Sequence, residues 1–536
     1  MSRAAPAAVR PPTTRLLLVT VVTLLVGVGV FFVLAGESVH FVAANSDGAT
    51  VVLEGQSMQA GAPLLSGWSL PLDSFFSTEV PLYAAAVALF GLRHDLANAV
   101  PAFLATLVVI VGVIIAARPG RGAGRLGGAT LVVALLALPS PALAYFFLQG
   151  PWHVGTTLAC LVAFAAVASG RLGWRALVAV ALLAVGLLGD VQTLALGVVP
   201  VALDGVVAAC RSRSPRAGGP FVAVAAASVG LAYGLRRLFD AIGTFGLVDA
   251  NPTARFAQVG QNLGHLPSRF AGLFGVGTIP IGSATSPSRL APGHVVALVV
   301  VLAGLVLGVG SLVLGAVGGD ARRRVAPGSR TLDDLLVFGI AGDLCAFVFL
   351  AATGNGDYAR YLTAGVIFSV VLAGRLASRI AGRDRRATVA VLALSGVLLA
   401  IGAGAFVLDL RQPRATRPAD ALGAFLVSHH LTSGLGDYWS SSIVTTSTGG
   451  AVTVRPVITT PAGTLARYGR QTTAAWYRGA RFSFLVFDLH RPWRSVNATS
   501  AAATFGPPRE VLTEGTYRVY VFSSPVTISA VGYSNA

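Results

Sequence analysis

The apolar residues of this chain gather in long uninterrupted runs that are separated by short polar connections. Many of these runs are close to the length of about 20 residues with which a helix crosses a bilayer. The pattern therefore predicts an all-α polytopic membrane bundle of about eleven transmembrane helices. We place these helices at Leu16–Leu34, Leu96–Ala117, Leu126–Leu148, Val154–Ser169, Ala176–Gly189, Leu194–Cys210, Phe221–Leu238, Val295–Val317, Leu332–Ala352, Leu362–Ala377 and Val389–Leu408.

Arginines in the connections predict the orientation of the bundle, because basic residues favour the cytoplasmic side of a membrane protein. They occur in every second connection, whereas the short segments Gln149–His153 and Gly189–Thr193 hold none. The chain is therefore expected to begin inside the cell with an uncleaved first span and to end outside it. The arginine-bearing connections contain Arg118, Arg121 and Arg125; Arg171 and Arg175; Arg211, Arg213 and Arg216; Arg322, Arg323, Arg324 and Arg330; and Arg375, Arg379, Arg383, Arg385 and Arg386.

Three longer segments are then expected on the outer side. Residues 1–410 form the membrane domain, with outside loops at about 37–95 and 239–293. Within the first loop, Val80–Leu92 is apolar but too short to cross, so we expect a helix at the membrane interface. Residues 411–536 are expected to form a small exported α/β domain, because the helical run Ala419–Leu431 precedes several runs of strand length. These predicted strands are Ala451–Val457, Phe482–Asp488, Thr516–Phe522 and Val526–Val531.

The composition supports a membrane protein and excludes one class of partner. Of the 536 residues, 54% are hydrophobic and 11% are charged, whereas about a quarter are charged in soluble domains. The net charge of +17 comes from arginine, since the chain contains no lysine. These arginines form no basic stripe with interleaved aromatic residues, so nucleic acid is not an expected partner. The bias towards Arg, Ala, Gly and Val is typical of a GC-rich bacterial genome, which favours a bacterial cytoplasmic membrane.

Carboxylates in the first outer loop are the first candidates for chemistry, because acidic residues are scarce in this chain. Asp47 could act as a general base towards an acceptor hydroxyl, or it could cap the turn-prone segment Asn45–Gly48. Glu79 could cap the interfacial helix, or it could be a second carboxylate that binds a divalent cation or orients an acceptor. Glu54 and Asp73 are interpreted as solvated loop residues.

Other candidates stand where the chain meets the membrane boundary. Asp190 lies at the predicted outer end of a span, a position at which an ionisable group often serves function. His153 and the pair Arg360–Tyr361 could bind substrate or could simply anchor the chain at the interface. Arginine suits phosphate because its planar fork donates two hydrogen bonds to phosphate oxygens. The basic residues expected on the outer side that could neutralise a phosphate or diphosphate are Arg236, Arg237, His265, Arg269 and Arg360.

Several segments resemble those of the GT-C class glycosyltransferases, which are membrane enzymes that move a sugar from a polyprenyl-phosphate carrier to an acceptor on the outer side. Ser46-Asp47-Gly48 and Thr78–Gly91 look like the acidic first loop and juxtamembrane helix of that class, and Arg360-Tyr361-Leu362 resembles a segment found late in such enzymes. The resemblance implies that Asp47 is the catalytic base and that Glu79 and Asp190 position the acceptor or a cation. It further implies that Arg360 holds the lipid phosphate, and that the acceptor is a cell-wall glycan or a lipid.

Two other functions remain open at the level of the sequence. A transporter or flippase for a lipid-linked or polar solute would need ionisable residues along a path through the bilayer, and Asp204 and Asp343 are the candidates. A non-catalytic envelope scaffold would use its exported domain to bind partners. An outward-facing cavity shared by Asp47, Glu79 and Arg360 would favour the enzyme over both alternatives.

Overall fold

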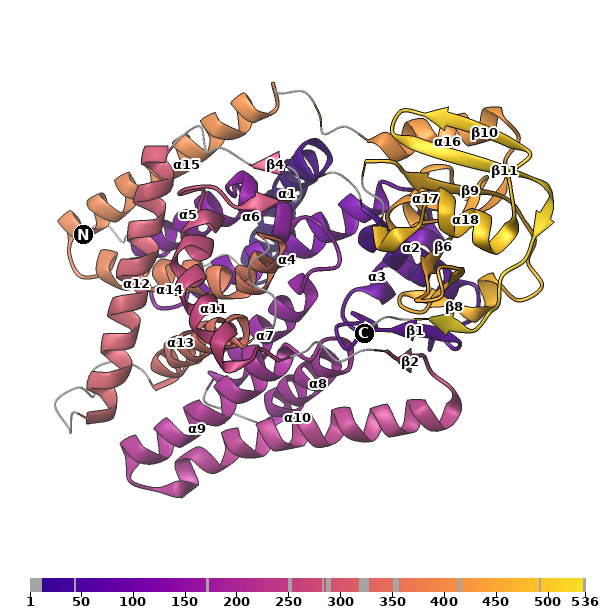
Figure 1. Ribbon diagram of the computed structural model, residues 1–536. Coiled ribbons are helices and arrows are strands. Elements are labelled where there is room, and N and C mark those ends of the chain that lie inside the picture. Colours follow the sequence, from indigo (N-terminus) through magenta and orange to yellow (C-terminus); the bar gives the residue numbers. More distant parts are fainter. Residues whose placement is uncertain are drawn as a thin grey trace, which may run out of the picture.

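The computed structural model describes residues 12–42, 45–169, 173–248, 253–281, 284–285, 291–317, 327–349, 356–411, 414, 417–490 and 493–533. Helices gather into one bundle, and the C-terminal residues form a separate sheet beside it (Figure 1). Among the predicted topology signals, Arg171 and the run from Arg322 to Arg324 lie outside the described residues.

Seven helices in the described part of the chain are long and apolar enough to cross a membrane. They are hydrophobic over most of their circumference, which is typical of helices that face lipid or a buried neighbour. Two begin with a tighter or wider turn, namely the π-helix η1 (Leu194–Val198) before α9 and the 3₁₀-helix η3 (Gly356–Leu362) before α14. The seven are α1 (Pro12–Phe41), α4 (Leu96–Ala117), α9 (Val199–Ser212), α10 (Pro215–Ile242), α12 (Ala291–Val317), α14 (Thr363–Ala381) and α15 (Arg385–Asp409).

The span expected at Leu126–Leu148 is broken into α5 (Ala123–Leu136) and α6 (Pro141–Phe147), which meet at 84°. The break follows from the sequence Pro139-Ser140-Pro141, because proline lacks the N–H that a continuous helix needs. Ser140 then caps α6 by accepting a hydrogen bond from the Leu143 N–H. Counted as one bent span, this pair raises the candidate spans to eight among the described residues.

Three further apolar helices correspond to the remaining predicted spans. α7 (Val154–Val167) and α8 (Gly173–Gly189) are shorter than a typical crossing helix. α13 (Pro327–Val348) has the length of a span and carries Asp333 and Asp334 near its start, where they pair with arginines of neighbouring helices. The count of eleven spans thus stays a prediction.

The first outer segment contains a helix that the sequence pattern did not predict, α2 (Ser46–Gln59), followed by β1 (Trp68–Leu70) and α3 (Val80–Phe90). A helix is thus present at the expected position as α3, and its location at the membrane interface stays a prediction. α2 and α3 pack closely at Gly55, where a Cβ atom would lie 2.7 Å from the backbone nitrogen of Ala84. The second outer segment likewise contains an unpredicted helix, α11 (Phe256–Leu273), and the short strands β2 (Gly246–Leu247), β3 (Pro280–Ile281) and β4 (Ala284–Thr285).

The C-terminal residues fold into a mixed seven-stranded sheet in the order β10-β11-β9-β5-β6-β7-β12. β-Branched and aromatic side chains such as Val454, Phe484 and Val486 are buried on its faces. The last predicted strand, Val526–Val531, does not form: Val526 is the final residue of β11, and the residues after it are not in a strand until β12. The elements are α16 (Pro418–Ser428), β5 (Ser433–Gly436), α17 (Ser442–Ser447), β6 (Thr453–Thr459), β7 (Leu465–Tyr468), β9 (Phe482–Asp488), α18 (Ala498–Phe505), β10 (Glu510–Glu514), β11 (Tyr517–Val526) and β12 (Gly532–Tyr533).

A small second sheet joins the C-terminal domain to the outer segments. β8 (Thr472–Thr473) comes from the C-terminal domain and pairs antiparallel with β1, and β1 pairs in parallel with β2 on its other side. Beside this sheet the rings of Trp68 and Trp476 meet edge to face, with 4.9 Å between their centroids. The C-terminal domain is thereby held against the end of the bundle that carries α2 and α3 (Figure 1).

Candidate functional site

A cavity of about 1100 Å³ lies between the helical bundle and the C-terminal domain. Its walls come from the start of α2, from the ends of several bundle helices and from the C-terminal domain. Side chains that are far apart in the sequence therefore face one space. Those that bear most directly on chemistry are Asp47, Tyr145, Trp152, Arg360, Tyr438 and Trp493.

Asp47 lies in the first turn of α2, where the partial positive charge of the helix N-terminus favours a carboxylate. The capping role that the sequence left open for Asp47 is taken by Asn45, whose side-chain oxygen accepts a hydrogen bond of 2.9 Å from the Gly48 N–H. Asp47 can therefore face the cavity, and its side chain is among those that line it.

Tyr438 approaches Asp47 from the C-terminal domain, 391 residues later in the chain. Its hydroxyl donates a hydrogen bond of 2.5 Å to Asp47 Oδ1 and also lies 2.8 Å from Gln471 Oε1. Only 3% of Tyr438 is exposed, and burial together with the Asp47 charge raises the pKa of Tyr438 well above its usual value. The tyrosine therefore stays protonated and acts as a donor.

Asp437 fixes the backbone that carries this tyrosine. Its Oδ1 accepts hydrogen bonds from the Trp439 and Ser440 N–H groups at 2.8 and 3.1 Å, which caps the short 3₁₀-helix Tyr438–Ser440. Burial raises the pKa of Asp437 to about 6, although these donors favour the carboxylate. Tyr438 is not among the site residues predicted from the sequence, where only a turn-forming residue followed by two aromatic residues, Asp437-Tyr438-Trp439, marks its position.

Arg360 belongs to the wall of the cavity that the helical bundle forms, within η3. Its guanidinium lies over the ring of Tyr361 at 5.0 Å from the centroid and near the ring of Trp152 at 5.7 Å. Its Nη2 also donates a hydrogen bond of 3.3 Å to Tyr361 Oη. Aromatic faces attract a cation without neutralising it. The positive charge therefore remains available to an anion in the cavity.

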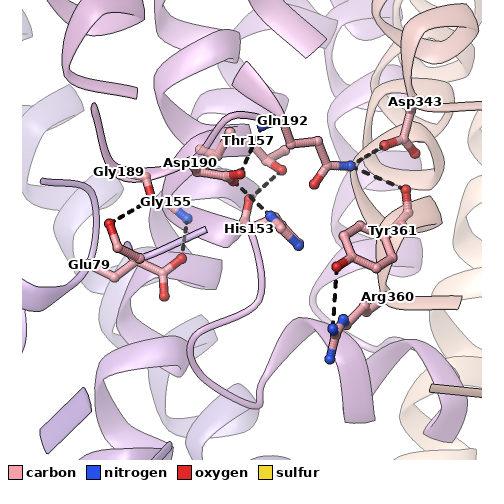
Figure 2. A network of polar contacts seen from close by, with 12 residues as sticks. Glu79, His153, Gly155, Thr157, Gly189, Asp190, Gln192, Asp343, Arg360 and Tyr361 are labelled. Carbon is pink, nitrogen blue, oxygen red and sulfur yellow. Dashed lines mark hydrogen bonds and ion pairs between the residues drawn. The ribbon is translucent and has the colours of Figure 1, made fainter. Parts of the chain in front are cut away.

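Behind this wall, a buried polar network joins the segments that precede α7 and follow α8 (Figure 2). His153 Nδ1 lies 2.7 Å from Asp190 Oδ2, and the same oxygen accepts a hydrogen bond of 2.6 Å from Thr156 Oγ1. Glu79 joins the network from the start of α3, where its Oε1 accepts a hydrogen bond of 3.0 Å from the Gly155 N–H. The network thus fixes the backbone next to Trp152.

Electrostatics differ between the two acids of the network. Burial disfavours an imidazolium, but the adjacent Asp190 carboxylate outweighs this effect and raises the pKa of His153. In return, Asp190 has a lowered pKa despite its burial, so the two residues form an ion pair. Glu79 is 1% exposed, and burial raises its pKa to about 7 although Gly155 and His153 favour the carboxylate.

Asp343 and Gln192 extend the network towards the middle of the bundle (Figure 2). Gln192 Nε2 donates a hydrogen bond of 2.9 Å to Asp343 Oδ1, and the Gly365 N–H donates one of 2.8 Å to Asp343 Oδ2. Each oxygen of this buried carboxylate therefore has a hydrogen-bond donor, one from the turn after α8 and one from the first turn of α14. No group of three or more His, Cys, Asp or Glu residues in the described part of the chain is arranged to hold a metal ion.

The predicted site residues fall into three sets. Asp47 and Arg360 line the cavity, whereas Glu79, His153, Asp190 and Tyr361 lie in the packed layer next to it. The other four predicted phosphate-binding residues do not line it. Arg236 pairs with Asp240 on the same helix at 2.7 Å, and Arg237 donates to Tyr233 Oη. His265 and Arg269 lie on α11.

Glu54 does not match its interpretation as a solvated loop residue. It lies on α2, two helical turns after Asp47, and is 1% exposed. Burial, followed by the nearby Asp47 charge, raises its pKa well above the usual value. The sequence could not reveal this burial, because α2 was not predicted and its apolar side depends on contacts with α3 and α17.

Comparison with known proteins places the fold. No protein-family model matches the chain, and no curated protein matches it by sequence. Among solved structures, ArnT from Cupriavidus metallidurans bound to undecaprenyl phosphate aligns over 96% of this chain and 99% of its own, with a TM-score of 0.54 and 12% identity. The Archaeoglobus fulgidus oligosaccharyltransferase, tethered with an acceptor peptide, aligns over 87% of this chain and 69% of its own, with a TM-score of 0.43 and 10% identity. The chain has the fold of the GT-C class of membrane glycosyltransferases that its sequence resembles.

Proposed function

We propose that this chain is a membrane glycosyltransferase that moves a sugar from a polyprenyl-phosphate donor to a cell-envelope acceptor on the outer face of a bacterial cytoplasmic membrane. The observation that carries the proposal is that Asp47 and Arg360 line one cavity beneath the C-terminal domain. A carboxylate and a guanidinium facing one space are suited to accept a proton from an acceptor and to bind a phosphate leaving group. The structural likeness to ArnT, which was solved with undecaprenyl phosphate bound, supports a lipid phosphate as the carrier.

In the proposed step, the acceptor hydroxyl oxygen attacks the anomeric carbon of the donor sugar while Asp47 takes the hydroxyl proton. The bond between the anomeric carbon and the phosphate oxygen breaks, and its electron pair leaves with the polyprenyl phosphate. Arg360 stabilises the charge that develops on this leaving group. Because attack and departure occur on opposite faces of the sugar, the configuration at the anomeric carbon inverts.

Other residues of the site position Asp47 and Arg360. Tyr438 holds Asp47 through its hydrogen bond, so the exported domain takes part in assembling the site. Tyr361 orients Arg360, and the ion pair of His153 and Asp190 supports the segment that carries Trp152. A catalytic contact by Glu79 remains a prediction, and its bond to the Gly155 N–H favours a positioning role. Arg236, Arg237, His265 and Arg269 have no part in this step.

The proposal includes eleven spans, with the N-terminus inside and the C-terminal domain outside. Eight candidate spans are counted when the bent pair of α5 and α6 is one crossing, and we add α7, α8 and α13. The orientation is supported by the arginines Arg118, Arg121 and Arg375, which lie at the end of the bundle away from the proposed site. Basic residues at that end are expected on the cytoplasmic side.

Profiling of envelope glycans and lipid-linked sugars in a strain that lacks this chain tests the function. The proposal predicts that one lipid-linked sugar accumulates while one glycan linkage is lost, and that the accumulated lipid is accessible from the outer side. Accumulation that is confined to the inner leaflet would instead indicate a flippase. An unchanged glycan and lipid profile would leave the scaffold as the better explanation.

A further inference from the structure

A second cavity, of about 1040 Å³, lies at the other end of the helical bundle. α4 separates the two spaces, since His94 just before it lines the first cavity and Arg118 just after it lines the second. With 22 residues, this helix spans roughly 33 Å at 1.5 Å per residue. The second cavity is therefore not part of the proposed transfer site.

Arginines dominate the lining of the second cavity. They come from the connection between α4 and α5, from the first turn of α5, from the start of α8 and from the last turns of α14. Within the described part of the chain, no Asp or Glu is among the residues that line it. The converging residues are Arg118, Arg121, Arg125, Arg175, Arg375 and Arg379.

Only part of this positive charge is neutralised by the carboxylates nearby. Arg375 is 1% exposed, donates a hydrogen bond of 2.6 Å to Asp333 Oδ1, and shares this aspartate with Arg379. Arg118 and Arg125 donate to backbone carbonyls, which carry no net charge. The pKa of Arg118 is lowered, mainly by burial and to a smaller extent by the positive charge of Arg175. The second effect shows that the like charges of these two arginines repel one another. An anion bound among them would relieve that repulsion.

The rim of this cavity has the features of a membrane interface. Trp174, at the start of α8, is 70% exposed and lies 5.6 Å from the Arg175 guanidinium. Leu177, one turn further on, is also exposed. Exposed aromatic and apolar side chains next to arginines are typical of the level of lipid headgroups. A phosphate on a lipid could therefore reach the arginines from the side.

We propose that this arginine-lined cavity is a second phosphate-binding site, distinct from the transfer site and located at the opposite end of the bundle. Its ligand is a phosphate group carried either by an anionic lipid headgroup or by a soluble phosphate compound. Guanidinium groups suit it because their paired N–H donors match phosphate oxygens. Topology alone would place arginines at this end, but it would not require six of them to converge on one cavity.

The test compares two triple variants of the full chain in detergent. One is Arg118→Gln/Arg121→Gln/Arg175→Gln, which removes cavity charges. Its control, Arg213→Gln/Arg216→Gln/Arg386→Gln, removes as many charges from exposed positions that do not line the cavity. Binding of dioctanoyl phosphatidylglycerol and of inorganic phosphate is measured by ligand-induced shifts in unfolding temperature. Because the readout is binding, failure of the proposed glycosyltransfer would not affect it.

We expect the apparent Kd of the bound probe to rise roughly 100-fold in the cavity variant and to stay unchanged in the control, since each arginine near an anionic headgroup contributes about a fivefold factor. Binding of the lipid but not of inorganic phosphate assigns the site to a headgroup, and the reverse assigns it to a soluble phosphate. Equal affinities of the two variants for both probes would overturn the proposal. If the triple cavity variant does not fold, the single substitution Arg121→Gln at an exposed cavity residue replaces it, and Arg216→Gln is its control.

Discussion

Replacing Tyr438 with phenylalanine isolates the contribution of the C-terminal domain to the proposed site. The change removes one hydroxyl, which donates a hydrogen bond of 2.5 Å to Asp47 Oδ1. The ring remains, so the aromatic packing against Tyr468 and Trp493 is retained. Hydrogen bonds to charged groups contribute about 1.5–3 kcal/mol. If that bond holds Asp47 in its reactive position, transfer should slow by about 10- to 100-fold.

The assay is the initial rate at which labelled sugar passes from the lipid-linked pool to the envelope glycan in membranes that carry equal amounts of each variant. Tyr520→Phe is the matched control, because Tyr520 is in the same domain but does not line the cavity. It should transfer at the wild-type rate. A wild-type rate for Tyr438→Phe, measured where Asp47→Asn is inactive, would refute the claim that the C-terminal domain positions the base.

Three further predictions follow from the same geometry. Arg360→Lys keeps the charge but loses the planar fork, so the apparent KM for the lipid donor should rise by about tenfold or more, whereas Arg236→Lys should leave it unchanged. In the folded protein the pKa of Glu79 is about 7, above its value of about 4.5 in the unfolded chain, so the folded state binds the proton more tightly. The protonated Glu79 therefore stabilises the fold below about pH 4.5, and this stability is lost as the pH rises through 7. Glutamine does not titrate, so the free energy of unfolding of Glu79→Gln relative to wild type should increase by up to about 3 kcal/mol between pH 4.5 and 7 in thermal unfolding. A stability difference that stays constant across that pH range would contradict the assignment. Trp476→Ala removes the partly buried ring that meets Trp68 and should weaken the docking of the C-terminal domain by about 1 kcal/mol, the contribution of an aromatic pair. Limited proteolysis of this domain should be faster, and an unchanged cleavage rate would show that the contact does not hold the domain.

The membrane helices could be predicted from the sequence because their signal is local. A run such as Leu96–Ala117 is apolar over its whole length and matches α4 residue for residue. α2 was missed because Asn45-Ser46-Asp47-Gly48 reads equally well as a turn, and the following residues lack a clear apolar face. Its helix is stabilised by packing against α3, which Gly55 permits by its small size.

The candidate site was predictable only in part, because convergence is a property of the fold. Asp47 and Arg360 were recognised from their positions at the membrane boundary and from the resemblance to GT-C enzymes. Tyr438 could not be paired with Asp47, since 391 residues separate them. Arg236 was grouped with the phosphate-binding residues although Asp240 follows it by four positions, and this spacing on a helix already signals a local ion pair.

The central claim is tested most directly by complementing the deletion strain with Asp47→Asn and with Asp95→Asn. Asp95 is a partly exposed acidic residue of the same segment between α1 and α4, pairs with Arg93 and does not line the cavity. The product glycan and the lipid-linked sugar are quantified at matched protein levels. We predict that Asp47→Asn leaves the glycan absent and the lipid-linked sugar accumulated, whereas Asp95→Asn restores both to wild-type amounts. Full restoration by Asp47→Asn would contradict the assignment of Asp47 as the base that accepts the proton.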